Sequence, residues 1–118
     1  MWFGDLVTCN WWSETWLNEG FARYFQYFGV EMIKSDWDLE EQFVVENLQQ
    51  SMQLDSTDRT HPMTDNSVKT KAQASAMFDN ISYNKAASVI RMLSHVIGID
   101  KFKEILHHHL DRKYESFW

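Results

Sequence analysis

The stretch "WWSETWLNEGFARYFQYFGVEMIK", residues 11 to 34, decides the fold class of this chain. Apolar side chains recur in it every three or four residues, which is the spacing of one face of an α-helix. We therefore predict a helix from about Ser13 to Lys34. Gly20 lies inside it, where glycine costs about 1 kcal/mol relative to alanine, so we expect a close contact to justify it. The predicted apolar face consists of Leu17, Phe21, Phe25, Phe28 and Met32.

The rest of the chain predicts further helices, joined by one long loop. The polar segment 55–71 carries the only proline, and loops of this length are often functional or mobile. Ser35 or Asp36 is expected to cap the helix before this loop and Asp100 to cap the last helix, with Gly98 ending the one before it. The expected helices run from Asp36 to about Leu54, Ala72 to Asp79, Ser82 to Ile97, and onward from Asp100.

No segment alternates apolar and polar residues with a period of two, so the chain is predicted to be all-α, with about four to five helices. Residues 1–12 are expected to be irregular, with Gly4 as a breaker. The residues expected to face inward on the later helices are Leu39, Phe43, Val44, Leu48, Met52, Ala86, Ala87, Ile90, Leu93, Ile97, Phe102, Ile105, Leu106 and Leu110.

Composition limits the classes of function. The 118 residues suit one domain or a piece of one, and 44% hydrophobic with 15% aromatic content is typical of a globular chain. A net charge of −6 without a basic patch argues against a nucleic-acid partner. No apolar run reaches the length of a membrane span, and the single Cys9 cannot form an internal disulfide. The start, rich in large apolar side chains and unlike a signal peptide, leads us to expect a fragment.

Glu19 has two interpretations on helical spacing. It precedes Arg23 by four residues, where an ion pair would contribute a few tenths of a kcal/mol. Alternatively, its carboxylate faces a pocket as a metal ligand or an acid–base group. Spacing alone favours the ion pair, but helical periodicity does not decide between the two.

The segment "MWFGDLVTCNWWSETWLNEGFARYF", residues 1 to 25, resembles the part of the M1-family zinc aminopeptidases that follows their H-E-x-x-H motif. The resemblance is greatest to animal membrane aminopeptidases of the aminopeptidase N type. In that family eighteen residues separate the motif from a further glutamate. Met1 to Asn18 fill that spacing and Glu19 comes next, so the sequence is expected to start directly after the second zinc histidine.

A second segment supports the same family. "MFDNISYNKAASVIRML", residues 77 to 93, is similar to its F-D-x-I-x-Y-x-K-G-A-S-V-I-R-M-L segment, and "HPM" at residues 61–63 falls where the family has a His-Pro element. The resemblance implies that residues 1–118 are a partial catalytic domain, the helical part of a thermolysin-like zinc metallopeptidase. Ala86 departs from the pattern, since the family usually has glycine there. Alanine suits a helix, but its methyl group could crowd the packing behind Tyr83.

The resemblance assigns roles to two residues. Glu19 would be the third protein ligand of one Zn²⁺ ion, which keeps an open position for water. Tyr83, which apolar spacing alone would place in the core, would donate a hydrogen bond to the oxyanion of the tetrahedral intermediate. Such donors contribute about 10²–10³ in rate. Both zinc histidines, the glutamate that activates water and the family's G-x-M-E-N segment lie outside the sequence, so the chain alone is expected to be inactive and to bind zinc weakly or not at all.

The remaining candidates are weaker. Asn18 could orient the zinc ligand, although capping or surface polarity fits nearly as well. Adjacent His107, His108 and His109 point about 100° apart on a helix, so they belong to a solvated face, as does the i,i+4 pair of His107 and Asp111. The other expectations are that Trp11, Trp12 and Trp16 pack around the metal site, that His61 is a turn residue, that His95 lies near a helix C-terminus, and that Cys9 is a small buried group.

The predicted function is that of a zinc-dependent aminopeptidase, whose full-length form removes single residues from peptides with free N-termini. By resemblance the parent is a cell-surface ectoenzyme anchored by a segment missing here. Whether the full-length protein forms a homodimer is left undecided. Two alternatives remain: an M1 relative that also hydrolyses epoxides, and a catalytically inactive M1-like scaffold. The residues of the segments "WLNEGFA" and "ISYNKA" favour the aminopeptidases, and the presence of both Glu19 and Tyr83 argues against the scaffold.

Overall fold

A computed structural model describes residues 2–115, and within this range the predicted all-α class is confirmed. Five helices and the separate 3₁₀ turn η2 account for the regular structure, and the only β feature among the described residues is an isolated bridge between Phe3 and Val7. The elements are η1 (Trp12–Glu14), α1 (Thr15–Glu31), η2 (Ser35–Trp37), α2 (Leu39–Phe43), η3 (Val44–Gln49), α3 (Gln50–Asp55), α4 (Lys71–Ala76), η4 (Ile81–Lys85), α5 (Ala86–Ile97) and α6 (Ile99–Glu115).

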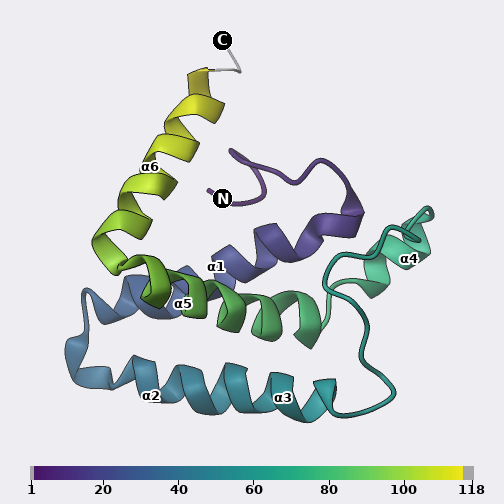
Figure 1. Ribbon diagram of the computed structural model, residues 1–118, viewed down its shortest axis with the longest axis horizontal. Helices are drawn as coiled ribbons and strands as arrows, with labels where there is room; N and C mark the ends of the chain where they lie inside the picture. The colour runs from purple at the N-terminus through teal and green to yellow at the C-terminus, as the bar shows by residue number, and fades with distance from the viewer. Residues whose placement is uncertain (1, 116–118) are drawn as a thin grey trace.

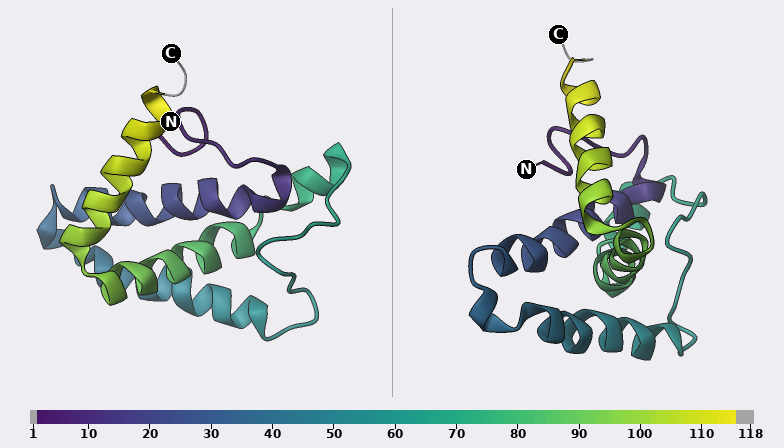
Figure 2. Two further views of the ribbon diagram at one scale, coloured as in Figure 1. Left: turned by 45° about the horizontal axis from the view of Figure 1, so that its top comes forward. Right: turned by 60° about the vertical axis from the view of Figure 1, so that its left-hand side comes forward.

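Three long helical rods form the body of the molecule. Helix α1 and the η4–α5 rod lie side by side and run in the same direction, while the α2–η3–α3 rod runs in the opposite direction (Figure 1). Helix α6 turns away at the end of α5, and the loop 56–70 leads from α3 to the short α4 at the other end of the molecule (Figure 2). A slab of 42 × 38 × 22 Å results.

Helix boundaries differ from the predicted ones where tertiary contacts, rather than local sequence, determine the end of a helix. Helix α1 ends at Glu31 rather than Lys34, and the Glu31 carboxylate accepts a hydrogen bond of 3.0 Å from the N–H of Leu39, the first residue of α2. Asp38, with a φ of 49°, separates the 3₁₀ turn η2 from α2. Neither Ser35 nor Asp36 therefore caps this rod, because the turn η2 occupies their positions.

The last two helices show one confirmed boundary and one wrong one. Gly98 ends α5 with a φ of 90°, a conformation that favours glycine, as predicted. Helix α6 begins at Ile99, so Asp100 lies inside the first turn instead of capping it. Its carboxylate near the positive end of the helix dipole is still favourable.

The main core lies between α1, α2, α5 and α6. It consists of Tyr24, Tyr27, Leu39, Phe43, Ala87, Ile90 and Phe102. The predicted apolar face of α1 is rotated: Tyr24 and Tyr27 are buried, while Phe21, Phe25 and Phe28 lie at the flank, partly buried. The prediction was wrong for five residues that are exposed, namely Met32, Met52, Leu93, Ile97 and Ile105.

The rotation of α1 follows from a close helix–helix contact at Gly20. A Cβ atom built on Gly20 would lie 2.7 Å from the Cβ of Ala86 and 3.0 Å from Cδ1 of Ile90. Only a residue without a side chain lets the two backbones approach so closely. The contact that we expected at Gly20 is thus confirmed, and the Ala86 methyl, fully buried, is accommodated because Gly20 faces it.

Two of the rods contain π-helical turns, which the sequence did not predict. They are η3 in the α2–α3 rod and η4 at the start of the α5 rod. The two wide turns face each other, since the side-chain amide of Asn84 donates to the carbonyl of Glu46 at 3.3 Å. Such turns occur often at functional sites. Here η4 is the segment that carries Tyr83.

Candidate functional site

Glu19 and Tyr83, far apart in the sequence, come together where α1 packs against η4. Glu19 lies next to Gly20, the point of closest approach, and Tyr83 lies one turn before Ala86 on the opposing rod. Both side chains are half-buried, and the Glu19 carboxylate lies close enough to the phenol to affect its ionisation. Burial, together with the hydrogen bond and the negative charge of Glu19, raises the pKa of Tyr83 to about 12. The hydroxyl therefore stays protonated at neutral pH and can act as a donor.

The ion pair between Glu19 and Arg23 is absent from the described residues. Arg23 turns toward the second rod, where its Nε donates to Oδ1 of the buried Asn47 at 2.8 Å, and its terminal nitrogen donates to Gln26 at 3.0 Å. The i,i+4 interpretation was wrong because the polar group across the helix interface gives Arg23 a better partner. This leaves the Glu19 carboxylate with Tyr83 as its neighbour.

The structure also bears on the metal site that is expected at Glu19. Among the side chains that the structure describes, no three from His, Cys, Asp or Glu gather closely enough to hold a metal ion. A half-buried carboxylate beside a neutral phenol is nevertheless a suitable oxygen donor for zinc. The residues present fit zinc as one ligand of a set that other residues would have to complete.

The tryptophans lie against the polar loop. Trp11 donates from its indole nitrogen to the carbonyl of Val68 at 3.0 Å, and Trp16 donates to the Thr64 hydroxyl at 2.8 Å. The ring of Trp12 packs near Phe78, with 6.4 Å between centroids. These residues fasten the loop to the start of α1. Their expected role as packing around a metal stays a prediction.

Asn18 and Cys9 contact each other. The Asn18 amide lies 3.6 Å from the Cys9 sulfur, with Asn18 as donor, so Asn18 has a partner other than Glu19. Cys9 is half-buried rather than fully buried, and burial raises the pKa of its thiol above the ordinary value. A protonated thiol is a poor nucleophile, which agrees with a packing role.

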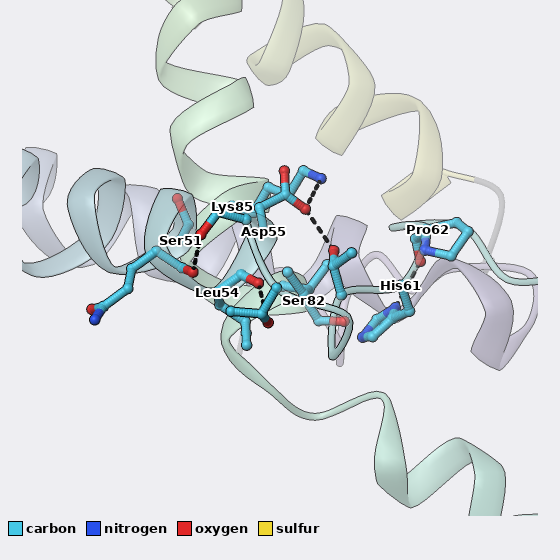
Figure 3. A network of polar contacts seen from close by, with 12 residues as sticks. Ser51, Leu54, Asp55, His61, Pro62, Ser82 and Lys85 are labelled. Atoms are coloured by element: carbon cyan, nitrogen blue, oxygen red, sulfur yellow. Dashed lines mark hydrogen bonds and ion pairs between the residues drawn. The ribbon is translucent and has the colours of Figure 1, made fainter.

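His61 is more than a turn residue. Its Nε2 lies 2.9 Å from an oxygen of Asp79, and its Nδ1 lies 2.8 Å from the carbonyl of Pro62, toward which the ring is turned in Figure 3. Burial alone would lower the pKa of His61. The hydrogen bonds to Pro62 and Asp79, with the negative charges of Asp79 and Asp65, outweigh burial and raise it.

Asp79 is the residue at this site that the sequence analysis missed. One oxygen of its carboxylate accepts the backbone N–H groups of Ile81 and Ser82, at 3.0 and 3.1 Å. The signal was present in the sequence, because Asp is a typical N-cap residue, whose side chain accepts the N–H groups two and three residues later. We had placed Asp79 at the end of a helix that in fact stops at Ala76.

The other histidines lie at the surface. His107 and Asp111 form the i,i+4 pair at 3.0 Å, with the two side chains 81% and 63% exposed, as expected of a solvated face. His95 bonds back to the carbonyl of Arg91 in the last turn of α5. Within the described part of the chain, no helix is both long and apolar enough to cross a membrane.

Comparison with known proteins gives one consistent family. The family model described as the peptidase family M1 domain matches residues 1–116. Aminopeptidase N of Bos taurus is 48% identical over 105 residues, which is 87% of this chain and 11% of the relative. Membrane alanyl aminopeptidase of Heliothis virescens is 46% identical over 110 residues, 93% of this chain and 11% of the relative. Aminopeptidase Ey of Gallus gallus is 44% identical over 111 residues, 92% of this chain and 11% of the relative.

The curated relatives are thus much longer than this chain, which spans about a ninth of their length. The match nevertheless runs through nearly every described element, from the start of the sequence to the end of α6. A family model that covers almost the whole sequence and relatives more than 40% identical agree on the family. The chain belongs to peptidase family M1.

Proposed function

We propose that the full-length protein containing this chain is a zinc-dependent aminopeptidase, in which Glu19 is one metal ligand and Tyr83 is a catalytic residue. The observation that carries the proposal is the convergence of these two side chains at the α1–η4 contact. Both stand at the positions that the M1 motifs assign to a metal-binding glutamate and a catalytic tyrosine. The names of the relatives supply the activity class.

Each residue has a distinct task. Zinc would supply Lewis-acid activation of water and of the scissile carbonyl. The Glu19 carboxylate would hold the ion from the side of α1, and polypeptide outside this chain would supply the other ligands. The Tyr83 hydroxyl, protonated at neutral pH, would donate a hydrogen bond to the developing oxyanion. Its attachment to the first turn of a buried rod keeps the donor in place before substrate arrives.

Substrate and location follow the relatives. Peptides with a free N-terminus are the proposed substrates, since aminopeptidases act on that end. Two of the relatives are named membrane alanyl aminopeptidases, so we propose a membrane-associated parent, anchored by polypeptide other than residues 2–115. The isolated chain is proposed to be inactive, because no three metal-ligating side chains gather among its described residues.

The direct test measures hydrolysis of amino-acid arylamides by the full-length protein. We expect activity that is lost on chelation and restored by zinc. Glu19→Gln should lower both bound zinc and kcat/KM by at least about tenfold, the usual range for a change at a metal ligand or its partners. Zinc content by atomic absorption and the rate are measured on the same preparation.

Glu14→Gln is the matched control, since Glu14 is a half-buried glutamate just before α1. It should leave zinc content and rate within about twofold of the parent. Full zinc content in Glu19→Gln would remove Glu19 from the ligand set. A full-length protein that releases no arylamine with zinc bound would contradict the proposed activity and favour a non-catalytic scaffold.

A further inference from the structure

The backbone N–H of Tyr83 is bonded to Asp79. The N–H of Tyr83 donates to the main-chain carbonyl of Asp79 at 3.0 Å. The Asp79 side chain accepts the N–H groups of Ile81 and Ser82 through a single oxygen, at 3.0 and 3.1 Å. The first turn of η4, including the segment that carries the phenol, is therefore fixed relative to Asp79.

The second oxygen of the Asp79 carboxylate faces His61, in the middle of the loop 56–70. The distance from His61 Nε2 to this oxygen is 2.9 Å, and the two side chains are only 24% and 32% exposed. The other ring nitrogen, Nδ1, faces the Pro62 carbonyl at 2.8 Å. Because both partners are acceptors, only an imidazolium with two N–H groups satisfies both contacts. The charged groups facing the ring are Asp79 and Asp65, both acidic, and they favour that form.

A separate contact holds the loop at the other end of η4. Lys85, its last residue, places Nζ 2.8 Å from an oxygen of Asp55, and the Thr60 hydroxyl donates to the same oxygen at 2.6 Å. Figure 3 shows Lys85 and Asp55 side by side, with His61 further along the loop near Ser82. The loop is thus bonded to both ends of the π-turn, through His61 at one end and through Thr60 and Asp55 at the other.

We propose that His61 and Asp79 are positioning residues for Tyr83: their ion pair clamps the loop 56–70 to the first turn of η4 and so sets the place of the phenol hydroxyl. Their effect acts through the backbone of η4. The proposal rests on the proposed function for its catalytic consequence, but the clamp itself is a statement about η4 that holds with or without activity.

The test uses the full-length protein and a double-mutant cycle. His61→Leu removes both N–H groups, His61→Gln keeps one donor near the position of Nε2, and Asp79→Asn keeps the backbone cap while removing the charge. We expect His61→Leu to lower kcat about tenfold with KM nearly unchanged, since misplacement of a reacting group costs rate more than binding. His61→Gln should recover part of the loss. In a Tyr83→Phe background, His61→Leu should cost nothing further, because the group it positions is already gone.

The matched control is His107→Leu, which removes the histidine of an exposed His–Asp pair on α6. It should change neither kcat nor KM. Zinc content should stay equal in all variants. If His61→Leu lowers kcat by the same factor with and without the Tyr83 hydroxyl, or if it has no effect on kcat, the proposal is overturned. Should His61→Leu not fold, His61→Gln and Asp79→Asn carry the same comparison.

Hydrogen exchange followed by mass spectrometry tests the clamp independently of activity. We expect His61→Leu and Asp79→Asn to speed amide exchange in a peptide covering residues 79–85, while a peptide from α6 keeps its rate. Unchanged exchange in residues 79–85 overturns the proposal. If the parent has no peptidase activity but this peptide exchanges faster, the proposed function fails while the clamp stands, so the two failures are distinguishable.

Discussion

The Tyr83 phenol lies beside a carboxylate, and this neighbour fixes what the hydroxyl can do. Burial and Glu19 raise the pKa of Tyr83 to about 12, so the group is a hydrogen-bond donor at neutral pH. A donor that is already oriented before the reaction stabilises developing negative charge without reorganisation. At the scale of single residues, the site therefore consists of one acceptor that suits a cation and one donor that suits an anion.

Tyr83→Phe removes the donor while keeping the ring. In the full-length protein we expect kcat for an amino-acid arylamide to fall by about 10²–10³, the range seen when an oxyanion donor is lost. KM and zinc content should change little, because the hydroxyl acts in the transition state. Tyr27→Phe is the control, since its hydroxyl bonds Glu46 on the second rod. A loss in Tyr83→Phe no greater than in Tyr27→Phe would exclude the catalytic role.

His61 predicts a pH dependence of stability. Its pKa is raised in the folded chain above the ordinary 6.5, so the folded state binds the proton more tightly than the unfolded state. This contribution is fully present below about pH 6.5 and is lost as the pH rises through the raised value. We expect the urea midpoint to fall between about pH 6 and pH 8.5 by more in the parent than in His61→Gln. Equal pH dependence in the two proteins would contradict the raised pKa.

At the scale of elements, the important contact is the one between α1 and the η4–α5 rod. Gly20 and Ala86 meet there, and Glu19 and Tyr83 lie beside this contact, one on each rod. The spacing of the two helices therefore also sets the spacing of the two functional groups. The Ala86 methyl, which stands where the family usually has glycine, fills the space that Gly20 leaves open.

Gly20→Ala should separate the two rods. The new Cβ would lie 2.7 Å from that of Ala86 and 3.2 Å from its main-chain carbon, and neither belongs to a flexible side chain. We expect a loss of about 1–3 kcal/mol in the free energy of unfolding, measured by urea titration with circular dichroism. Ala86→Gly in the same chain should recover much of this loss. A Gly20→Ala protein as stable as its parent would disprove the close contact.

Gly29 provides the matched control on the same helix. A Cβ there meets no heavy atom within 4 Å. Gly29→Ala should stabilise the chain by about 0.5–1 kcal/mol, which is the helical preference for alanine. Opposite signs at the two glycines would separate the packing effect from the propensity effect.

The sequence predicted the positions of the helices better than it predicted which face of each helix is buried. The helices, the loop and the end of α5 at Gly98 follow from local signals. The exposure of Met32 and Leu93 does not, because Met32 lies beyond the end of α1 at Glu31 and Leu93 lies on the outer side of α5. Which side of a helix is covered depends on tertiary contacts such as the one at Gly20, and no local pattern reports them. At the site, motif spacing singled out Glu19 and Tyr83. The pair of His61 and Asp79 escaped because it joins a loop to a helix start, and periodicity carries no information about such pairs.

At the scale of the whole molecule, the chain is a slab 22 Å thick, about two helix diameters. Such a shape has a large surface for its volume, and α5 shows the effect. Its inner side carries the buried Ala86, Ala87 and Ile90. Its outer side is also apolar but is exposed. That outer side consists of Val89, Met92, Leu93 and Val96, which are 41%, 64%, 48% and 84% exposed. An exposed apolar surface of this kind is normally covered by another part of a protein.

The isolated 118-residue chain should therefore bind hydrophobic dyes and self-associate. We expect strong fluorescence of anilinonaphthalene sulfonate and a light-scattering mass that rises with concentration. Replacing Met92 and Val96 together by lysine should reduce both signals without lowering the urea midpoint, because both side chains are mostly exposed. Lys101→Met, a change at an exposed residue of α6, is the control and should not reduce either signal. Weak dye binding by the parent chain would contradict this reading of α5.

The parallel course of α1 and α5 has a consequence for how the molecule folds. Two neighbouring helices that run in the same direction cannot be joined by a short turn. The chain between α1 and α5 therefore includes the whole α2–η3–α3 rod and the loop 56–70 (Figure 1). Closing so long a stretch costs chain entropy that only non-local contacts can offset. Glu19 and Tyr83 belong to opposite sides of this closure. The site forms only in molecules in which α1 and the η4–α5 rod have packed together. The activity of the full-length enzyme would therefore be proportional to the amount of fully folded protein.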